Sequence, residues 1–422
     1  MIRVRNAAAV LGLALGAMSA ATVIVPATAQ AAEEPAKPKI SKQVAVPLQA
    51  AQKAMQAKQW DTALAELKKA QAIEKKTPVE DYQIDEFLGY ILLQQKKYKD
   101  AAVVFERMLN SGLVPAGQVD ERTKAVAQMY FQEKDYKKAI EWAKKWLDKH
   151  PNQEDMMVLL GQAYYLQEDY KNAGDIMSKV VANAEKAGQS PKENYLQIVM
   201  SSHFKLDNKD GIADTLKKLV RYYPKQEYWN NLLDIYRRKS SGDRATLGYY
   251  RLMYDVGVLK DKADYMESAQ LAIEAGVPGE AQTTVEKGME NGTLKSTDKT
   301  EQGRYDRLLA AAKKQAATDR AALPQLAKDA EKATQGQADV GLGQAYLSYG
   351  MIDEAIAALE RGIKKGGVTD IDEAQISLGI AFLKKGQKDQ ARQAFKAVKA
   401  DSKWADLAEL WTVRTYSAGT ST

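Results

Sequence analysis

Two histidines are the first candidates for chemistry in this chain, because histidine titrates near neutral pH and is the commonest metal ligand. His150 precedes Pro151 at an expected helix end, where its ring can interact favourably with the terminal carbonyl groups. His203 lies in an expected helix at a position where similar segments carry Tyr or Phe, so we expect a packed ring. Neither histidine is expected to be catalytic or to bind a metal. The chain has no cysteine, so no thiol can act as a nucleophile or ligand.

Other catalytic motifs are also missing from the sequence. There is no His-Glu-x-x-His zinc motif, no Gly-x-x-x-x-Gly-Lys-Ser/Thr phosphate loop and no Gly-x-Ser-x-Gly turn. The many acidic residues include no pair that stands out for acid–base work. The sequence therefore predicts no catalytic residue, no cofactor and no metal site. An enzyme with an unrecognised site in residues 293–335 is kept as an alternative.

A recurring segment indicates the elements that position the remaining side chains. Leu160-Gly161-Gln162-Ala163-Tyr164 returns unchanged as Leu342-Gly343-Gln344-Ala345-Tyr346. Each copy precedes a short turn and a second amphipathic segment that opens on an alanine. A period of about 20 to 50 residues built from two helices is typical of a solenoid, which forms an extended binding surface.

The first small residue of each second helix marks the register of the repeats, and we call it the register residue. Successive register residues are 33 to 40 positions apart. A bulky side chain usually follows four positions later, and a small residue usually precedes by twelve, which predicts close approach of the paired helices. The register residues are Ala63, Ala101, Ala139, Ala173, Ile212, Ala245, Ala281, Ala321, Ala355 and Ala391.

This pattern resembles the tetratricopeptide-repeat family, whose unit of about 34 residues reads Leu-Gly-x-x-Tyr, then Ala-x-x-x-Phe, then Pro. The resemblance covers most of residues 44–400 and is weakest in 293–335, where Leu308, Leu309, Leu323 and Leu326 are the main signals. It implies an all-α, right-handed helical-repeat solenoid of about ten helix pairs with a C-terminal capping helix. The expected segments are a signal peptide (1–31), a flexible leader (32–43), repeats (44–292), a degenerate repeat (293–335), repeats (336–400), a capping helix (401–417) and a tail (418–422).

The N-terminal segment has the pattern of a secretory signal peptide. Arg3 and Arg5 precede an uncharged apolar stretch over residues 7–25, and Ala27-Thr28-Ala29 and Ala29-Gln30-Ala31 are small-x-small cleavage signals. The alternative is an uncleaved membrane anchor, because the stretch is close to the length that spans a bilayer. Cleavage predicts a periplasmic protein without an integral span.

The charge of the chain does not favour a nucleic-acid partner. It has 61 basic and 55 acidic residues, a net charge of +6, and the lysines are interleaved with acids. Nucleic-acid binding requires a concentrated basic stripe. We therefore expect a protein or peptide partner in the cell envelope, and the sequence does not predict the oligomeric state.

Candidate partner-binding residues come from the resemblance, because the first helices of this family line a concave groove. Glutamine recurs one position after the small residue, and aromatic side chains recur four positions after it. Glutamine can both donate and accept hydrogen bonds to an extended peptide, and aromatic rings are common interface anchors. The alternative is that the rings pack between neighbouring helices and the glutamines are neutral surface. The candidates are Gln52, Tyr90, Gln94, Gln128, Phe131, Gln162, Tyr165, Phe204, Arg237, Gln270 and Gln344.

The predicted function is a non-enzymatic scaffold that binds a partner segment in this groove. The family's lysine/asparagine clamp for a C-terminal carboxylate is not matched, since no repeat has asparagine at the first groove position. Arg237 and Arg238 form a local cationic spot that Asp234 is expected to neutralise in part. The central region, including Tyr222-Tyr223-Pro224 and Tyr228-Trp229, is similar to repeat proteins associated with TonB-type energy-transduction systems. The alternative is a subunit of an outer-membrane assembly or polysaccharide-export complex.

Overall fold

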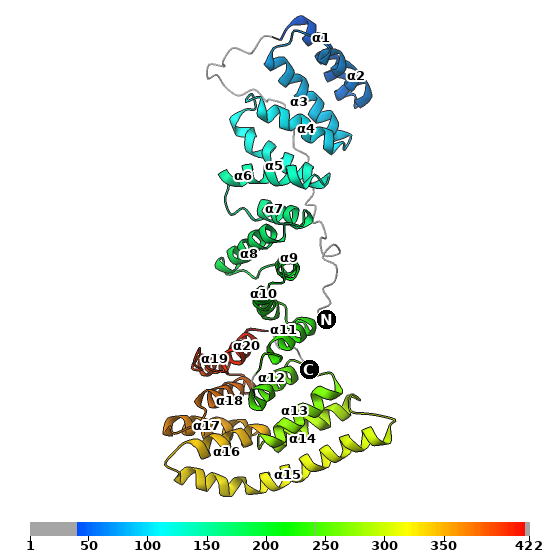
Figure 1. Cartoon of the computed structure of the whole chain (residues 1–422). Helices are drawn as coiled ribbons and strands as arrows, with labels where there is room; N and C mark the ends of the chain where they lie inside the picture. Colours follow the sequence, from blue (N-terminus) through cyan, green and yellow to red (C-terminus); the bar gives the residue numbers. More distant parts are fainter. Residues whose placement is uncertain (1–39, 241, 418–422) are drawn as a thin grey trace. The chain divides into compact units, whose positions relative to one another are not determined.

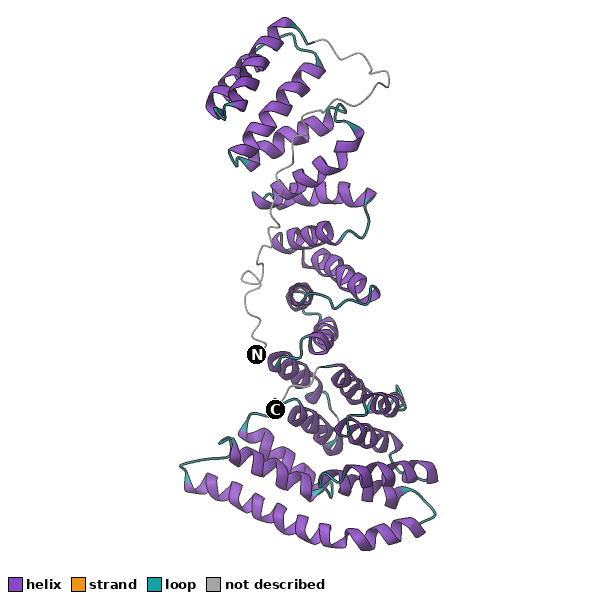
Figure 2. Cartoon of the chain, turned by 180° about the vertical axis from the view of Figure 1, so that it is seen from behind, coloured by secondary structure: helices purple, strands orange, loops and turns teal. Residues whose placement is uncertain are grey.

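The structure is a computed structural model that describes residues 40–240 and 242–417 (Figure 1). Throughout these residues the chain forms helices joined by turns and loops, with no strand (Figure 2). The predicted all-α repeat solenoid is therefore confirmed. The predicted signal peptide and the C-terminal tail lie outside the described residues.

The chain divides into two compact units, with the division after Lys209. We call residues 40–209 unit 1 and residues 210–417 unit 2. Unit 1 consists of four helix pairs followed by α9, and each helix packs against the next along the chain. Its helices are α1 (Lys42–Gln56), α2 (Trp60–Gln71), α3 (Pro78–Gln94), α4 (Tyr98–Asn110), α5 (Ala116–Gln132), α6 (Tyr136–Lys149), α7 (Glu154–Leu166), α8 (Tyr170–Lys186) and α9 (Glu193–Lys205).

Close packing within each pair follows from the small residue in the first helix. A Cβ atom added at Gly161 would lie 2.6 Å from Sδ of Met177, and one added at Gly343 would lie 2.6 Å from Cγ of Leu359. Met177 and Leu359 are the bulky residues four positions after the register alanines Ala173 and Ala355, which are themselves fully buried. The predicted close approach of the paired helices is confirmed, because only a residue without a side chain leaves room for the facing helix.

A left-handed residue closes the turn within most pairs, five positions before the register residue. Glycine adopts such a backbone without strain, whereas an L-residue with a Cβ pays roughly 1–2 kcal/mol. Three repeats of unit 2 have glycine at this position, while unit 1 has only residues with side chains there. The residues with positive φ at this position are Lys58, Lys96, Lys134, Glu168, Asp207, Gly276, Gly350 and Gly386.

The predicted flexible leader is wrong at its C-terminal end, because Ser41 belongs to the fold and α1 already begins at Lys42. The backbone N–H of Ser41 donates a 2.7 Å hydrogen bond to Oε1 of Glu80 in α3. Glu80 also accepts a 2.8 Å hydrogen bond from the backbone N–H of Thr77, as part of a capping box. Hydrogen bonds from Ser41 and then from Thr77 lower the pKa of Glu80 to about 2.

Unit 2 comprises the remaining helices. They are α10 (Lys209–Tyr222, which starts at the last residue of unit 1), α11 (Gln226–Arg237), α12 (Asp243–Asp255), α13 (Lys262–Glu274), α14 (Pro278–Glu290), α15 (Lys299–Lys332), α16 (Gln337–Ser348), α17 (Ile352–Lys365), α18 (Ile371–Lys384), α19 (Lys388–Lys396) and α20 (Ala405–Tyr416).

The expected helix pair in residues 293–335 is replaced by one long helix, α15 (yellow in Figure 1). The turn expected before Ala321 does not form, and Ala316, which occupies the turn position, is buried within the helix. The reason is local composition, since residues 310–322 are mostly Ala, Lys, Gln and Arg, which are strong helix formers. Within the two units, the described residues therefore form eight contacting helix pairs, together with α9, α10, α15 and α20.

The last helix makes more contacts than a simple cap requires. Besides α18 and α19, α20 contacts α12, which is far away in the sequence (Figure 1). Nε of Arg414 in α20 donates a 2.7 Å hydrogen bond to Asp255 of α12, and Oγ of Ser417 donates one of the same length to the carbonyl of Val220 in α10. Unit 2 is therefore closed by contacts between its first and last helices.

Candidate functional site

Several neighbouring first helices of the pairs contact each other. In unit 1, α1 contacts α3, α5 contacts α7, and α7 contacts α9. The hydroxyl of Tyr165 on α7 hydrogen-bonds Oγ of Ser201 on α9 at 2.7 Å. We call the predicted residues on this side the first-helix face of unit 1: Gln52, Tyr90, Gln94, Gln128, Phe131, Gln162, Tyr165 and Phe204.

The glutamines on this face are available for hydrogen bonding. Gln52 and Gln94 are exposed, whereas Gln128 and Gln162 are half-buried. None of these four side chains makes a hydrogen bond to another residue in the described part of the chain. A partner backbone that approaches the face would therefore not have to break internal hydrogen bonds of the protein.

The aromatic side chains on the face combine packing with exposure. Tyr90 meets Trp60 edge-on at 6.2 Å between ring centroids, Phe131 meets Tyr136 at 5.6 Å, and Tyr165 meets Tyr170 at 5.3 Å. Such pairs contribute about 0.5–1.5 kcal/mol each beyond the apolar area that they bury. Their first-helix rings are half-buried.

Phe204 differs from these three rings, because 42% of it is exposed. An exposed aromatic ring at the end of a row of half-buried rings is a natural contact for an apolar partner group. The alternative that the rings only pack between helices thus holds in part for Tyr90, Phe131 and Tyr165. It does not hold for Phe204.

The predicted groove residues of unit 2 are engaged within the protein. Arg237 donates a 3.2 Å hydrogen bond to the hydroxyl of Tyr250, and Nη2 of Arg238 lies 2.8 Å from Oδ2 of Asp234. Asp234 is also 3.6 Å from Nη2 of Arg237, so it offsets the local positive charge as expected.

The two remaining glutamines of the prediction are also in unit 2. Gln270 donates to Glu274 on its own helix at 2.8 Å. Gln344 donates to Oγ of Ser377 on the next first helix at 3.2 Å. Because these side chains have internal partners, unit 1 provides the better candidate face.

A hollow beside the turns of unit 1 was not predicted from the sequence. It has a volume of about 390 Å³ and is lined by Lys99, Val103, Tyr130, Glu133, Lys134, Asp135, Tyr136, Lys138 and Gln167. Its signal in the sequence is a lysine followed two positions later by an aromatic residue, at Lys58 and Trp60, Lys96 and Tyr98, and Lys134 and Tyr136.

A charged cluster forms one wall of this hollow. Nζ of Lys138 lies 2.6 Å from Oε2 of Glu106, and the hydroxyl of Tyr130 donates to the same carboxylate. Burial, together with the hydrogen bond to Glu106, raises the pKa of Tyr130 to about 12. Burial alone would raise the pKa of Glu106, but the hydrogen bonds from Lys138 and Tyr130 hold it below its ordinary value. At neutral pH Glu106 is therefore charged and Tyr130 keeps its proton, and the ion pair between Glu106 and Lys138 links α4 to α6.

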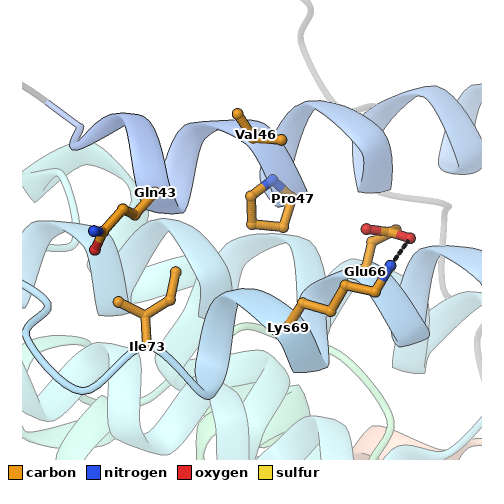
Figure 3. Close-up of a pocket in the computed structure, with 6 residues that line it drawn as sticks. All are labelled: Gln43, Val46, Pro47, Glu66, Lys69 and Ile73. Carbon is orange, nitrogen blue, oxygen red and sulfur yellow. Dashed lines mark hydrogen bonds and ion pairs between the residues drawn. The ribbon is translucent and has the colours of Figure 1, made fainter.

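A second hollow lies between α1 and α2 (Figure 3). It is lined by Gln43, Val46, Pro47, Glu66, Lys69 and Ile73, and has a volume of about 460 Å³. Val46 is 59% exposed, and Lys69 and Glu66 pair across one helical turn at 2.6 Å. Since Pro47 has no N–H group, the carbonyl of Gln43 loses its usual helical donor here. Half of the residues that line the hollow are apolar and half are polar, and the paired Glu66 and Lys69 are its charged residues.

The histidines have structural contacts. The His150 ring packs against Trp146 at 4.4 Å between centroids, and its Nε2 lies 2.9 Å from Oδ2 of Asp120. His203 is half-buried, and its Nδ1 lies 3.2 Å from Nδ2 of Asn208. Residues 40–240 and 242–417 contain no cluster of acidic and histidine side chains that could hold a metal ion. No helix in these ranges is both long enough and apolar enough to cross a membrane.

Comparison with known proteins identifies the repeats. A tetratricopeptide-repeat family model matches residues 48–117 and 340–403, and the model described as anaphase-promoting complex, cyclosome, subunit 3 matches residues 94–180. No curated protein matches the sequence.

Several solved structures are similar to part or most of the chain. A tetratricopeptide repeat protein from Parabacteroides merdae is 14% identical, with 88% of this chain and 99% of that chain covered and a TM-score of 0.29. MamA from Desulfovibrio magneticus is 19% identical over 44% of this chain and 98% of that chain, with a TM-score of 0.29. PilW, described as a type IV pilus biogenesis factor, is 13% identical over 46% of this chain and all of that chain, with a TM-score of 0.28.

Each identity is below 20% and each TM-score is below 0.3, so the family assignment does not rest on these structures. The family assignment comes instead from the matched repeats and from the packing of glycine against the bulky residue of the facing helix. The chain is a member of the tetratricopeptide-repeat family, recognised over residues 48–117 and 340–403.

Proposed function

We propose that this protein is a non-enzymatic scaffold that binds an extended segment of a partner protein along the first-helix face of unit 1. The observation that carries the proposal is the set of four glutamines without internal hydrogen bonds, interspersed with aromatic rings on consecutive first helices. Glutamine amides can pair with the N–H and C=O groups of an extended backbone. The rings offer apolar contacts at a small cost in side-chain entropy.

We further propose that the protein acts in the cell envelope after export. The support is the sequence of residues 1–31, with its basic start, apolar stretch and small-x-small cleavage signals. The similarity of the central region to repeat proteins of TonB-type systems makes a protein of such a system the first partner to test. Co-purification with envelope proteins of the native host tests this location.

The binding face is tested with three single variants, Phe131→Ala, Tyr165→Ala and Phe204→Ala. Each variant is measured both for thermal unfolding and for capture of the partner identified by crosslinking. Interface anchors typically contribute about 2 kcal/mol or more, a roughly thirtyfold change in affinity. We expect Phe204→Ala to weaken capture without lowering the melting temperature, because much of this ring is already exposed. Gln128→Ala and Gln162→Ala should weaken capture without loss of stability.

A matched control uses an exposed apolar residue away from the face. Leu113 lies in the loop between α4 and α5 and is 37% exposed. Leu113→Ala should leave capture unchanged. If Leu113→Ala abolishes capture and the glutamine and Phe204 variants do not, the binding surface lies on the loops between repeats and the proposal is wrong.

A further inference from the structure

The turns of the first three repeats have lysine in a backbone conformation that favours glycine. Lys58, Lys96 and Lys134 have φ values of 55°, 57° and 63°. They occupy the same position of three consecutive repeats, five residues before the register alanine. They therefore form a row along one edge of unit 1, which we call the turn edge.

Unit 2 shows that folding does not require lysine here. Gly276, Gly350 and Gly386 close the corresponding turns, with φ values of 76°, 72° and 83°. Strained backbone that persists where an unstrained residue would fit is an indication of function. Lysine at this position in three consecutive repeats therefore indicates that its positive charge has a function.

The lysines of the turn edge are also available for binding. Lys58, Lys96 and Lys134 are exposed, and none of them forms an ion pair with another residue within the ranges that the structure describes. Lys99 and Lys134 line the hollow of about 390 Å³, in which Val103 and Tyr136 provide apolar surface. The hollow thus has lysines, the acids Glu133 and Asp135, and apolar surface side by side.

The turn edge adjoins the first-helix face through aromatic contacts. Trp60, two residues after Lys58, packs against Tyr90 of that face, and Tyr136, two residues after Lys134, packs against Phe131. A chain lying along the face would therefore have its side chains within reach of the lysines. The face supplies neutral amides and rings, and the edge supplies positive charge.

We propose that the turn edge binds acidic side chains of the partner segment, so that the partner is an extended polypeptide with Asp or Glu interspersed among apolar residues. This inference rests on the proposed function. The three lysines are spread over three repeats and do not converge on a single carboxylate. They would therefore contact Asp or Glu side chains at several places along the partner segment. A free C-terminus is therefore not required.

The local acidic residues favour a polypeptide over a continuous anionic surface. Asp61, Asp100, Glu133 and Asp135 are exposed between the lysines. A lipid bilayer or a polyanion would place negative charge against these acids as well as against the lysines, which costs energy. A peptide can place its acids opposite the lysines alone.

The test uses a fluorescent peptide of alternating Glu and Phe, acetylated and amidated at its ends, titrated into the purified protein by fluorescence anisotropy. The variant is the triple substitution Lys58→Gly, Lys96→Gly and Lys134→Gly. We expect its affinity for the peptide to fall about tenfold, as three exposed charge pairs of ordinary strength would contribute together. The melting temperature should be unchanged or higher, since glycine relieves the backbone strain.

Two controls isolate charge at this edge. Glu168→Gly makes the same backbone change in the next repeat and should not weaken binding of the peptide. A peptide with Gln in place of Glu should bind the original protein and the triple variant equally. Equal affinity of the triple variant and the original protein for the acidic peptide would overturn the inference, and so would tighter binding to anionic phosphatidylglycerol vesicles than to the peptide.

The outcome is separable from failure of the proposed function. Gln128→Ala and Phe204→Ala should weaken binding of the Gln-containing peptide, whereas the lysine variant should not. Suppose that the face variants lower the affinity for the Gln-containing peptide, while the lysine variant binds the acidic peptide as tightly as the original protein. The first-helix face is then the binding site, and the preference for acidic partners is wrong. If neither set of variants affects either peptide, the binding face itself is wrong.

Discussion

Asp339, which is fully buried in α16, accepts a 2.6 Å hydrogen bond from Nε of Arg361 in α17. Its other carboxylate oxygen lies 2.8 Å from Nζ of Lys365. The same link occurs in unit 1, where Nε of Arg107 in α4 donates a 2.6 Å hydrogen bond to Asp85 in α3. Both pairs are separated by 22 residues along the chain. Two repeats in different units therefore use the same ion pair to fasten their helices.

Asp339→Asn should destabilise unit 2. The substitution removes the charged acceptor of the hydrogen bond from Arg361, and a hydrogen bond to a charged group contributes about 1.5–3 kcal/mol. It also removes the ion pair with Lys365. Asp353→Asn is the control, because Asp353 is mostly exposed and its pair with Lys385 should contribute about 0–1 kcal/mol. Thermal unfolding of both variants checks this. Equal melting temperatures for the two variants would show that the buried pair is not stabilising.

Ala173→Phe should overpack the contact between α7 and α8. Ala173 is fully buried, and adding a large side chain to a well-packed interior costs about 1–3 kcal/mol or more. Ser178→Phe on the same helix is the matched control, because Ser178 is exposed. Chemical denaturation monitored by circular dichroism checks the difference. An unchanged midpoint for Ala173→Phe would show that the residue is not at the helix contact.

The first repeat should lose stability in acid. Because hydrogen bonding lowers the pKa of Glu80 from 4.5 to about 2, its carboxylate stabilises the fold fully above pH 4.5. This contribution declines as the pH falls from 4.5 towards 2. Amide hydrogen exchange in α1, measured across this range and corrected for intrinsic rates, should show decreasing protection.

Glu80→Gln provides the control for the acid effect. The amide retains the shape of the side chain but has no carboxylate to protonate, so protection of α1 should be lower at neutral pH and less dependent on pH. If α1 of the original protein keeps full protection down to pH 2, the hydrogen bonds to Ser41 and Thr77 do not hold the segment in place.

Contacts within one repeat could be predicted from the sequence, whereas contacts between helices far apart in the chain could not. The pairing of Gly161 with Met177 follows from spacing within one repeat. By contrast, Arg414 and Asp255 are 159 residues apart, and nothing in the repeat pattern predicts their contact. The long helix α15 was missed because the repeat register suggested a turn where local helix propensity prevails.

The candidate face was predicted only in part for a similar reason. The register placed the glutamines and rings on the first helices, but the internal partners of Arg237 and Gln344 depend on neighbouring repeats. The positive φ values of Lys58, Lys96 and Lys134 were not predicted, because lysine is not a typical residue for a left-handed turn.

The mature protein should begin between Gln30 and Glu33. Both small-x-small signals end just before or within this segment, and cleavage there removes Arg3 and Arg5. Intact-mass measurement of protein isolated from the native host checks this. A chain that retains Arg3 and Arg5 would contradict the signal-peptide prediction.

Site-specific photocrosslinking tests the central claim most directly. A photoreactive amino acid is placed at Gln128 on the first-helix face, or at Lys144, an exposed residue of α6 in the same repeat. We predict that irradiation in the native host yields a defined adduct from the Gln128 position, and that mass spectrometry maps it to one extended segment of one partner protein. The Lys144 position should yield no such adduct. An adduct with that segment from Lys144 and none from Gln128 would contradict binding on the first-helix face.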